Sequence, residues 1–163
     1  MPAGNTYEAI ATQTLGSAAA SVTFSSIPST YTDLVLVVTG TVSTGDNLAL
    51  QFNGDTGNNY SWTYLIGSGS SAVSARTSNT NQVLSIGFGT STIANAIWQI
   101  NNYSNTTTNK TVINRGNRSD DGVSAWVGLW RNTAAINSIV VKTGGGYNLN
   151  TGTVVSLYGI AAA

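Results

Sequence analysis

The sequence contains no cysteine and no histidine among its 163 residues. Without cysteine, the chain can form neither a disulfide nor a thiolate metal site, and it has no thiol nucleophile. Without histidine, it lacks the most common general base and the most common transition-metal ligand. Ser-His-Asp triads, Cys-His pairs and histidine-based zinc sites are therefore excluded within one chain. We expect no catalytic residue, no bound metal and no cofactor, and hence a protein that is not an enzyme.

Charged side chains are also scarce, at 7% of the residues, and six basic residues balance six acidic ones. An average soluble domain has about 25% charged residues. A neutral chain without a basic run is poorly suited to binding nucleic acid or anionic membranes. Low net charge also limits colloidal solubility. Two explanations fit this low charge. Either the 42 Ser and Thr and 18 Asn side chains form the solvent-exposed surface, or an assembly covers much of the surface.

Long hydrophobic runs are absent, and none reaches the roughly 18 residues of a membrane-spanning helix. The first residues do not combine a basic segment with an apolar block, so we expect no secretory signal. Strong helix formers are rare, whereas β-branched and aromatic residues are common. This composition predicts an all-β protein, with residues 1–163 forming a single β-sandwich domain.

Apolar residues alternate with polar ones in short stretches separated by turn-forming residues, which predicts about ten strands in a sandwich or barrel. The expected strands are 7–15, 21–24, 33–42, 47–52, 60–66, 82–88, 93–101, 110–115, 123–131, 136–143 and 153–160. The continuous apolar run within 33–42 indicates a central strand that is buried on both faces.

Two further expectations concern pairing. Residues 47–52 and 60–66 are predicted to pair as a hairpin, because 53–59 contains glycines and asparagines that tolerate positive φ. Residues 67–80 are rich in serine and glycine, which predicts a long loop, with a short strand near Val73 at most.

Two acidic loops are candidate sites. The oxygen donors of residues 53–59 resemble a calcium loop, but a plain turn explains the same residues, and the full acidic set is missing. Asp120 and Asp121 lie near Arg115 and Arg118 in the sequence, and a solvated loop with weak ion pairs explains them better than a reaction site does.

The aromatic residues supply the candidate interface. Trp126 and Trp130 share one face of strand 123–131, Arg131 follows them, and Tyr147 lies in a glycine-rich segment. Exposed aromatics with arginine are typical of protein interfaces, and aromatics also stack on sugars. The alternative is that the tryptophan face forms the core. The stripe of Tyr60, Trp62 and Tyr64 favours the core still more strongly.

Several segments together resemble a known group of proteins. They are residues 5–37, 50–72, 100–117 and 127–141, followed by SLYGI at 156–160. In this order they are similar to small tailed-bacteriophage proteins, frequent in phages of cyanobacteria, some of which are virion decoration proteins. The resemblance covers most of the chain. It implies a jelly-roll-like antiparallel β-sandwich, and it carries over no catalytic motif.

The same resemblance implies a role and partners. We expect a capsid cement or decoration protein on the capsid exterior, forming a homotrimer and binding the major capsid protein, with no nucleic acid or membrane as partner. Residues 1–7 are expected to be either a disordered end or an extended arm that adds along a neighbouring subunit. The alternative is a tail-fibre module that recognises a cell-surface glycan through Trp126, Trp130, Tyr147 and Asn148.

Overall fold

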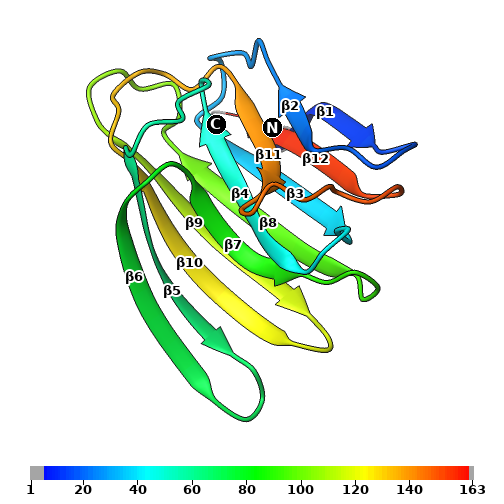
Figure 1. Ribbon diagram of the computed structural model, residues 1–163. Helices are drawn as coiled ribbons and strands as arrows, with labels where there is room; N and C mark the ends of the chain where they lie inside the picture. The colour runs from blue at the N-terminus through cyan, green and yellow to red at the C-terminus, as the bar shows by residue number, and fades with distance from the viewer. Residues whose placement is uncertain (1–5, 162–163) are drawn as a thin grey trace.

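The computed structural model describes residues 6–161, which form twelve antiparallel strands in two sheets (Figure 1). The expected all-β sandwich is therefore confirmed. The strands are β1 (Tyr7–Thr14), β2 (Ser21–Phe24), β3 (Asp33–Gly40), β4 (Asp46–Phe52), β5 (Tyr60–Gly67), β6 (Ala72–Thr80), β7 (Val83–Phe88), β8 (Ala94–Asn101), β9 (Lys110–Arg118), β10 (Gly122–Trp130), β11 (Ile139–Thr143) and β12 (Val154–Ile160).

Eight of the strands form a jelly roll. Without β5, β6, β9 and β10, the sheets read β1-β12-β3-β8 and β2-β11-β4-β7. Strands that follow one another along these eight alternate between the two four-stranded sheets, except β4 and β7, which pair within one sheet, and this is the jelly-roll arrangement. As expected, β3 is a central strand, paired with β12 on one side and β8 on the other.

The other four strands enlarge only one of the sheets. β9 and β10 continue the sheet beyond β8, and β5 and β6 are added beyond β10. The result is an eight-stranded sheet facing a four-stranded one. Figure 1 shows the β5–β6 hairpin reaching past the smaller sheet at the lower end of the molecule. The extension therefore presents a wide sheet face that the jelly roll alone would lack.

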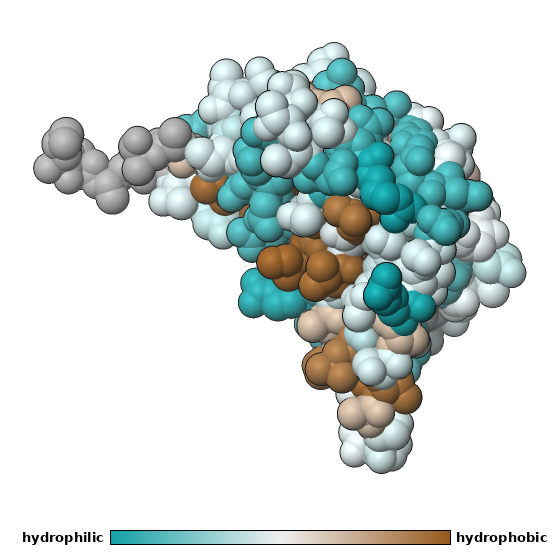
Figure 2. All heavy atoms as spheres, turned by 90° about the vertical axis from the view of Figure 1, so that its left-hand side faces the viewer, coloured by the Kyte–Doolittle hydropathy of each residue, from teal (hydrophilic) through white to brown (hydrophobic). Residues whose placement is uncertain are grey.

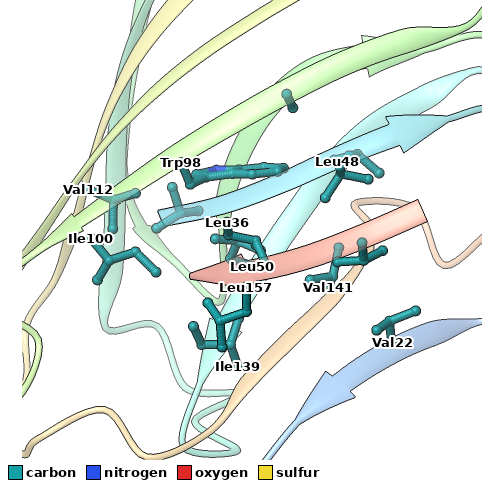
Figure 3. Close-up of a cluster of buried hydrophobic side chains, with 14 of the residues drawn as sticks. Val22, Leu36, Leu48, Leu50, Trp98, Ile100, Val112, Ile139, Val141 and Leu157 are labelled. Atoms are coloured by element: carbon teal, nitrogen blue, oxygen red, sulfur yellow. The ribbon is translucent and has the colours of Figure 1, made fainter. Parts of the chain in front are cut away.

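The core lies between the two sheets. Figure 3 shows side chains of both layers interdigitating, with Leu36, Trp98 and Leu157 from the large sheet and Leu48 and Val141 from the small one. All five are fully buried. Burying one such aliphatic side chain stabilises a fold by about 1.5–3 kcal/mol.

Two glycines bring β7 onto the extended part of the large sheet. A Cβ atom at Gly116 of β9 would lie 2.4 Å from Cγ2 of Ile86, and one at Gly128 of β10 would lie 2.4 Å from Cγ1 of Val83. Both distances are far below van der Waals contact. The absence of side chains at these two positions therefore lets β7 pack directly on β9 and β10.

The predicted hairpin of residues 47–52 and 60–66 is wrong. β4 pairs with β11 and β7 in the small sheet, whereas β5 pairs with β10 and β6 in the large one. Residues 53–59 form an arch between the sheets. The side chain of Asn53 ties this arch to the β10–β11 connection by accepting hydrogen bonds from the amides of Asn137 and Ser138. Alternation shows which residues share a face, but it does not identify the neighbouring strand.

The predicted long loop at 67–80 is also wrong. Only a short turn separates β5 from β6, and β6 covers nine residues at the edge of the sheet. Most of its side chains are exposed on both faces, so no apolar alternation reveals it. This strand is defined by its backbone hydrogen bonds to β5, its only neighbour in the sheet, and not by a pattern of buried side chains.

Smaller differences concern strand ends. β9 runs three residues further than expected, to Arg118, and β11 begins at Ile139 rather than 136. The proposed arm at 1–7 falls mainly on residues outside the described range, and Tyr7 already belongs to β1. Within residues 6–161, no helix is long and apolar enough to cross a membrane.

Candidate functional site

Trp130 is part of the core rather than a surface anchor. It is fully buried, and its indole stacks on the ring of Tyr60 with a centroid distance of 6.2 Å and packs against Phe52 at 5.6 Å. Its Nε1 donates a hydrogen bond of 2.7 Å to the carboxylate of Asp55. The indole therefore joins the arch at 53–59 to the large sheet.

Trp126 also points inward and is only 2% exposed. Its ring lies 4.5 Å from that of Tyr64 and 5.3 Å from that of Trp62, so the three form an aromatic cluster on β5 and β10. The alternative that placed the tryptophan face in the interior is the one that the structure matches. Their inward orientation follows from the alternation of β10, whose opposite face is exposed.

Arg131 and Tyr147 do not complete a binding surface with the tryptophans. The guanidinium of Arg131 donates to the carbonyls of Asn58 and Tyr60 and to the side chain of Asn79. Tyr147 is 44% exposed in the β11–β12 connection, near Asp46 at the start of β4, whereas Trp130 contacts Phe52 at the end of that strand. The predicted platform of Trp126, Trp130, Arg131 and Tyr147 is therefore not assembled.

The carboxylate of Asp55 is fully engaged within the arch. It accepts hydrogen bonds from Trp130, from the side chain of Asn59 and from the amide of Gly57. Partial burial opposes ionisation, but these hydrogen bonds outweigh it and lower the pKa of Asp55 below its usual value. Among residues 6–161, no group of three or more acidic side chains gathers as metal ligands would.

The acidic pair at the β9–β10 turn is held by one arginine. Nε of Arg118 lies 2.7 Å from Asp120, and Nη2 lies 3.5 Å from Asp121. The arginine also donates to the carbonyl of Gly87, which joins the turn to β7. This matches the expected ion-paired loop, with Arg118 rather than Arg115 as the partner.

A buried lysine lies at the other end of β9 and β10, away from the turn that joins them. Lys110 is 1% exposed, and its ammonium group donates to the carbonyls of Thr108 and Thr133 at 2.8 and 2.9 Å. Burial lowers the pKa of this lysine. The contacts fasten two connecting loops together, which is a structural role.

The exposed surface of the large sheet is the unexpected feature. We call the outward side chains of β5, β8, β9 and β10 the outer face. It carries a set of aliphatic residues that would ordinarily be buried or replaced by polar ones. These are Leu65, Ile97, Ile113, Val123 and Val127, each at least 39% exposed.

These residues form one continuous surface. Along β10, Val123 and Val127 are on the same face, and Val127 lies directly opposite Ile113 of β9. Leu65, Ala125, Arg115 and Ile97 form a row across all four strands. Figure 2, which looks toward the β5–β6 side, shows hydrophobic atoms gathered in the middle and towards the lower tip, beneath a mainly hydrophilic upper part.

The outer face is hollowed as well as apolar. A groove of about 630 Å³ crosses β5, β10, β9 and β8, and a second hollow of about 340 Å³ adjoins it at Ile97 and Arg115. The polar side chains at the rim of the groove hydrogen-bond to one another. The side chain of Asn95 accepts a hydrogen bond from Thr39 and donates one to Asn117. Arg115 is exposed and lines the groove, and within residues 6–161 it makes no hydrogen bond or ion pair.

The sequence carries only a partial signal for this face. The alternation of β10 showed that Val123 and Val127 share a face opposite the tryptophans. It could not show which face was exposed. Apolar residues on both sides of β5, β8 and β10 indicate that both faces are apolar, but the same pattern is typical of strands buried on both faces, so it does not tell which face is uncovered.

No protein-family model and no curated protein matches the chain. The site must therefore be interpreted from its own chemistry.

Proposed function

We propose that the protein is a structural protein of a virion, a decoration protein that binds the outside of the head shell as an oligomer and stabilises it. The observation that carries this proposal is the outer face, an apolar and grooved surface on an otherwise weakly charged molecule. Monomeric soluble proteins rarely expose large contiguous apolar surfaces, and such surfaces mark interaction sites.

Two other features support a role through contact rather than reaction. The clustered polar groups within residues 6–161, namely the arch at Asp55, the Arg118 turn and Lys110, each stabilise a local connection. The fold is a jelly roll, an architecture used in viral capsids. The likeness of segments such as 5–37 and 100–117 to small phage virion proteins points to the same role.

The proposed mechanism is mechanical. A genome-filled shell is under internal pressure, so a protein bridging neighbouring capsomers adds contact area where the shell would split. A trimer suits a threefold position of the shell, because cyclic symmetry repeats one interface. Attachment through apolar burial rather than many ion pairs implies only weak dependence on salt.

The decisive experiment is the copy number of the chain in purified particles of the virus that encodes it, measured by quantitative mass spectrometry. A stoichiometry comparable to that of the major capsid protein is expected. A few copies per particle would overturn the decoration role and favour a tail module that binds glycan. Absence from the particle would overturn the virion assignment altogether.

A further inference from the structure

The five strands from β8 to β6 at one side of the large sheet carry charge of a single sign. β5, β6, β8, β9 and β10 contain one lysine and three arginines but no aspartate or glutamate. Lys110 is buried and Arg118 is paired with the acidic turn. Arg76 and Arg115 are left exposed, and within the described residues neither has a hydrogen-bonding or ionic partner.

Among the described residues, no carboxylate forms an ion pair with either of these two arginines. Asp55, Asp120 and Asp121 are engaged in the arch and the turn instead. Stacking two copies of the outer face against each other would bring four unpaired arginines together in an interface from which water is largely excluded. Like charges in such an interface cost several kcal/mol, so charge disfavours a second copy as the occupant.

The lining of the groove also indicates the class of ligand. Its walls are aliphatic, with Leu65, Ile97 and Val123 around Arg115. Sugars are bound by stacking on aromatic rings. Among the described residues, no aromatic side chain lines this groove, and Tyr7 lies only at the adjoining hollow, beyond Ile97 and Arg115. An aliphatic groove with a free guanidinium instead fits a protein segment that combines aliphatic side chains with a carboxylate.

We propose that the outer face docks onto an aliphatic surface of the shell protein that carries a carboxylate, with Arg115 as its ionic partner and Arg76 at the margin. This inference rests on the proposed function and names the surface and the chemistry through which it would operate. The guanidinium would form a paired, partly desolvated contact at the centre of the groove, and the aliphatic residues would be covered around it.

The test compares binding of the wild-type chain and Arg115→Glu to purified shells prepared without the chain. The matched control is Lys142→Glu, which makes the same charge change on the small sheet at the opposite side of the sandwich. We expect Arg115→Glu to bind at least ~10-fold more weakly, and Lys142→Glu to bind like the wild type. Circular dichroism of each variant checks that the fold is retained.

A photo-crosslinking residue placed at Val127 identifies the occupant, with the same residue at Tyr147, exposed in the β11–β12 connection, as the control. We expect position 127 to cross-link to a shell-protein peptide containing Asp or Glu. Cross-links to a second copy of the chain, or wild-type binding by Arg115→Glu, would overturn the inference while leaving the decoration role intact. Failure of the wild-type chain to bind shells would overturn the proposed function, and the inference with it.

Discussion

At the scale of single residues, the missing side chain of Gly128 has the clearest consequence for the fold. The glycine lies on the inward face of β10, where a Cβ would overlap the side chain of Val83. Its φ is not in the left-handed region, so the requirement is for space and not for backbone freedom. The composition of the chain reveals many glycines but not which of them are contact points, because such contacts depend on which strand crosses above them.

We predict that Gly128→Ala destabilises the protein by about 1–3 kcal/mol, because the methyl group forces β7 away from the large sheet. Val83→Ala in the same chain should recover part of that loss, so the two effects should be non-additive by at least about 0.5 kcal/mol. Urea denaturation of the two single variants and the double variant measures this coupling. Gly16→Ala is the control, since nothing lies within 4 Å of its added Cβ. Strictly additive effects would contradict the proposed contact.

At the scale of elements, strand positions could be predicted far better than strand partners. β2 was predicted with its observed bounds, because its buried residues alternate with exposed ones. β6 was missed because it is an exposed edge strand that follows no hydrophobic period. The partners of β4 and β5 depend on an arch whose anchor, Asn53, bonds to residues more than 80 positions away. No local pattern encodes such a contact.

The arch also gives a prediction about pH. Since the folded-state pKa of Asp55 lies below its unfolded value, the ionised carboxylate stabilises the fold above about pH 4. That stabilisation is lost as the pH falls through the folded-state pKa. Asp55→Asn should therefore be less stable than the wild type at pH 7, by about 1–3 kcal/mol.

The same substitution should flatten the loss of stability below pH 4. Some acid dependence should remain, because a hydrogen bond from Thr92 and the contacts with Arg118 lower the pKa of Asp120 as well. Urea midpoints measured from pH 7 to pH 3 provide the comparison. Parallel pH profiles for the wild type and Asp55→Asn would show that the carboxylate does not stabilise the arch.

At the scale of the whole molecule, low charge and an uncovered apolar face act together. The composition indicates that the weakly charged surface is either solvated by neutral polar side chains or covered in an assembly. In the structure, each alternative fits a different region of the surface. Neutral to hydrophilic residues cover most of the upper part of the view in Figure 2, and hydrophobic ones gather in the middle and below. The location of the face depends on the insertion of β5–β6 and β9–β10, which composition cannot reveal.

We predict that the triple variant Ile113→Thr, Val123→Thr and Val127→Thr folds as stably as the wild type, to within about 1.5 kcal/mol. The three residues are exposed, and threonine keeps the β-branched shape that strands favour. The variant should nevertheless bind purified shells prepared without the chain more weakly than the wild type, because the docking proposed for the outer face would cover these aliphatic side chains. Co-sedimentation of each variant with the shells measures this, with Tyr147→Thr in the β11–β12 connection as the control. A large loss of stability would mean that the chain itself covers these side chains. Wild-type binding by the triple variant would mean that the outer face is not the surface that docks.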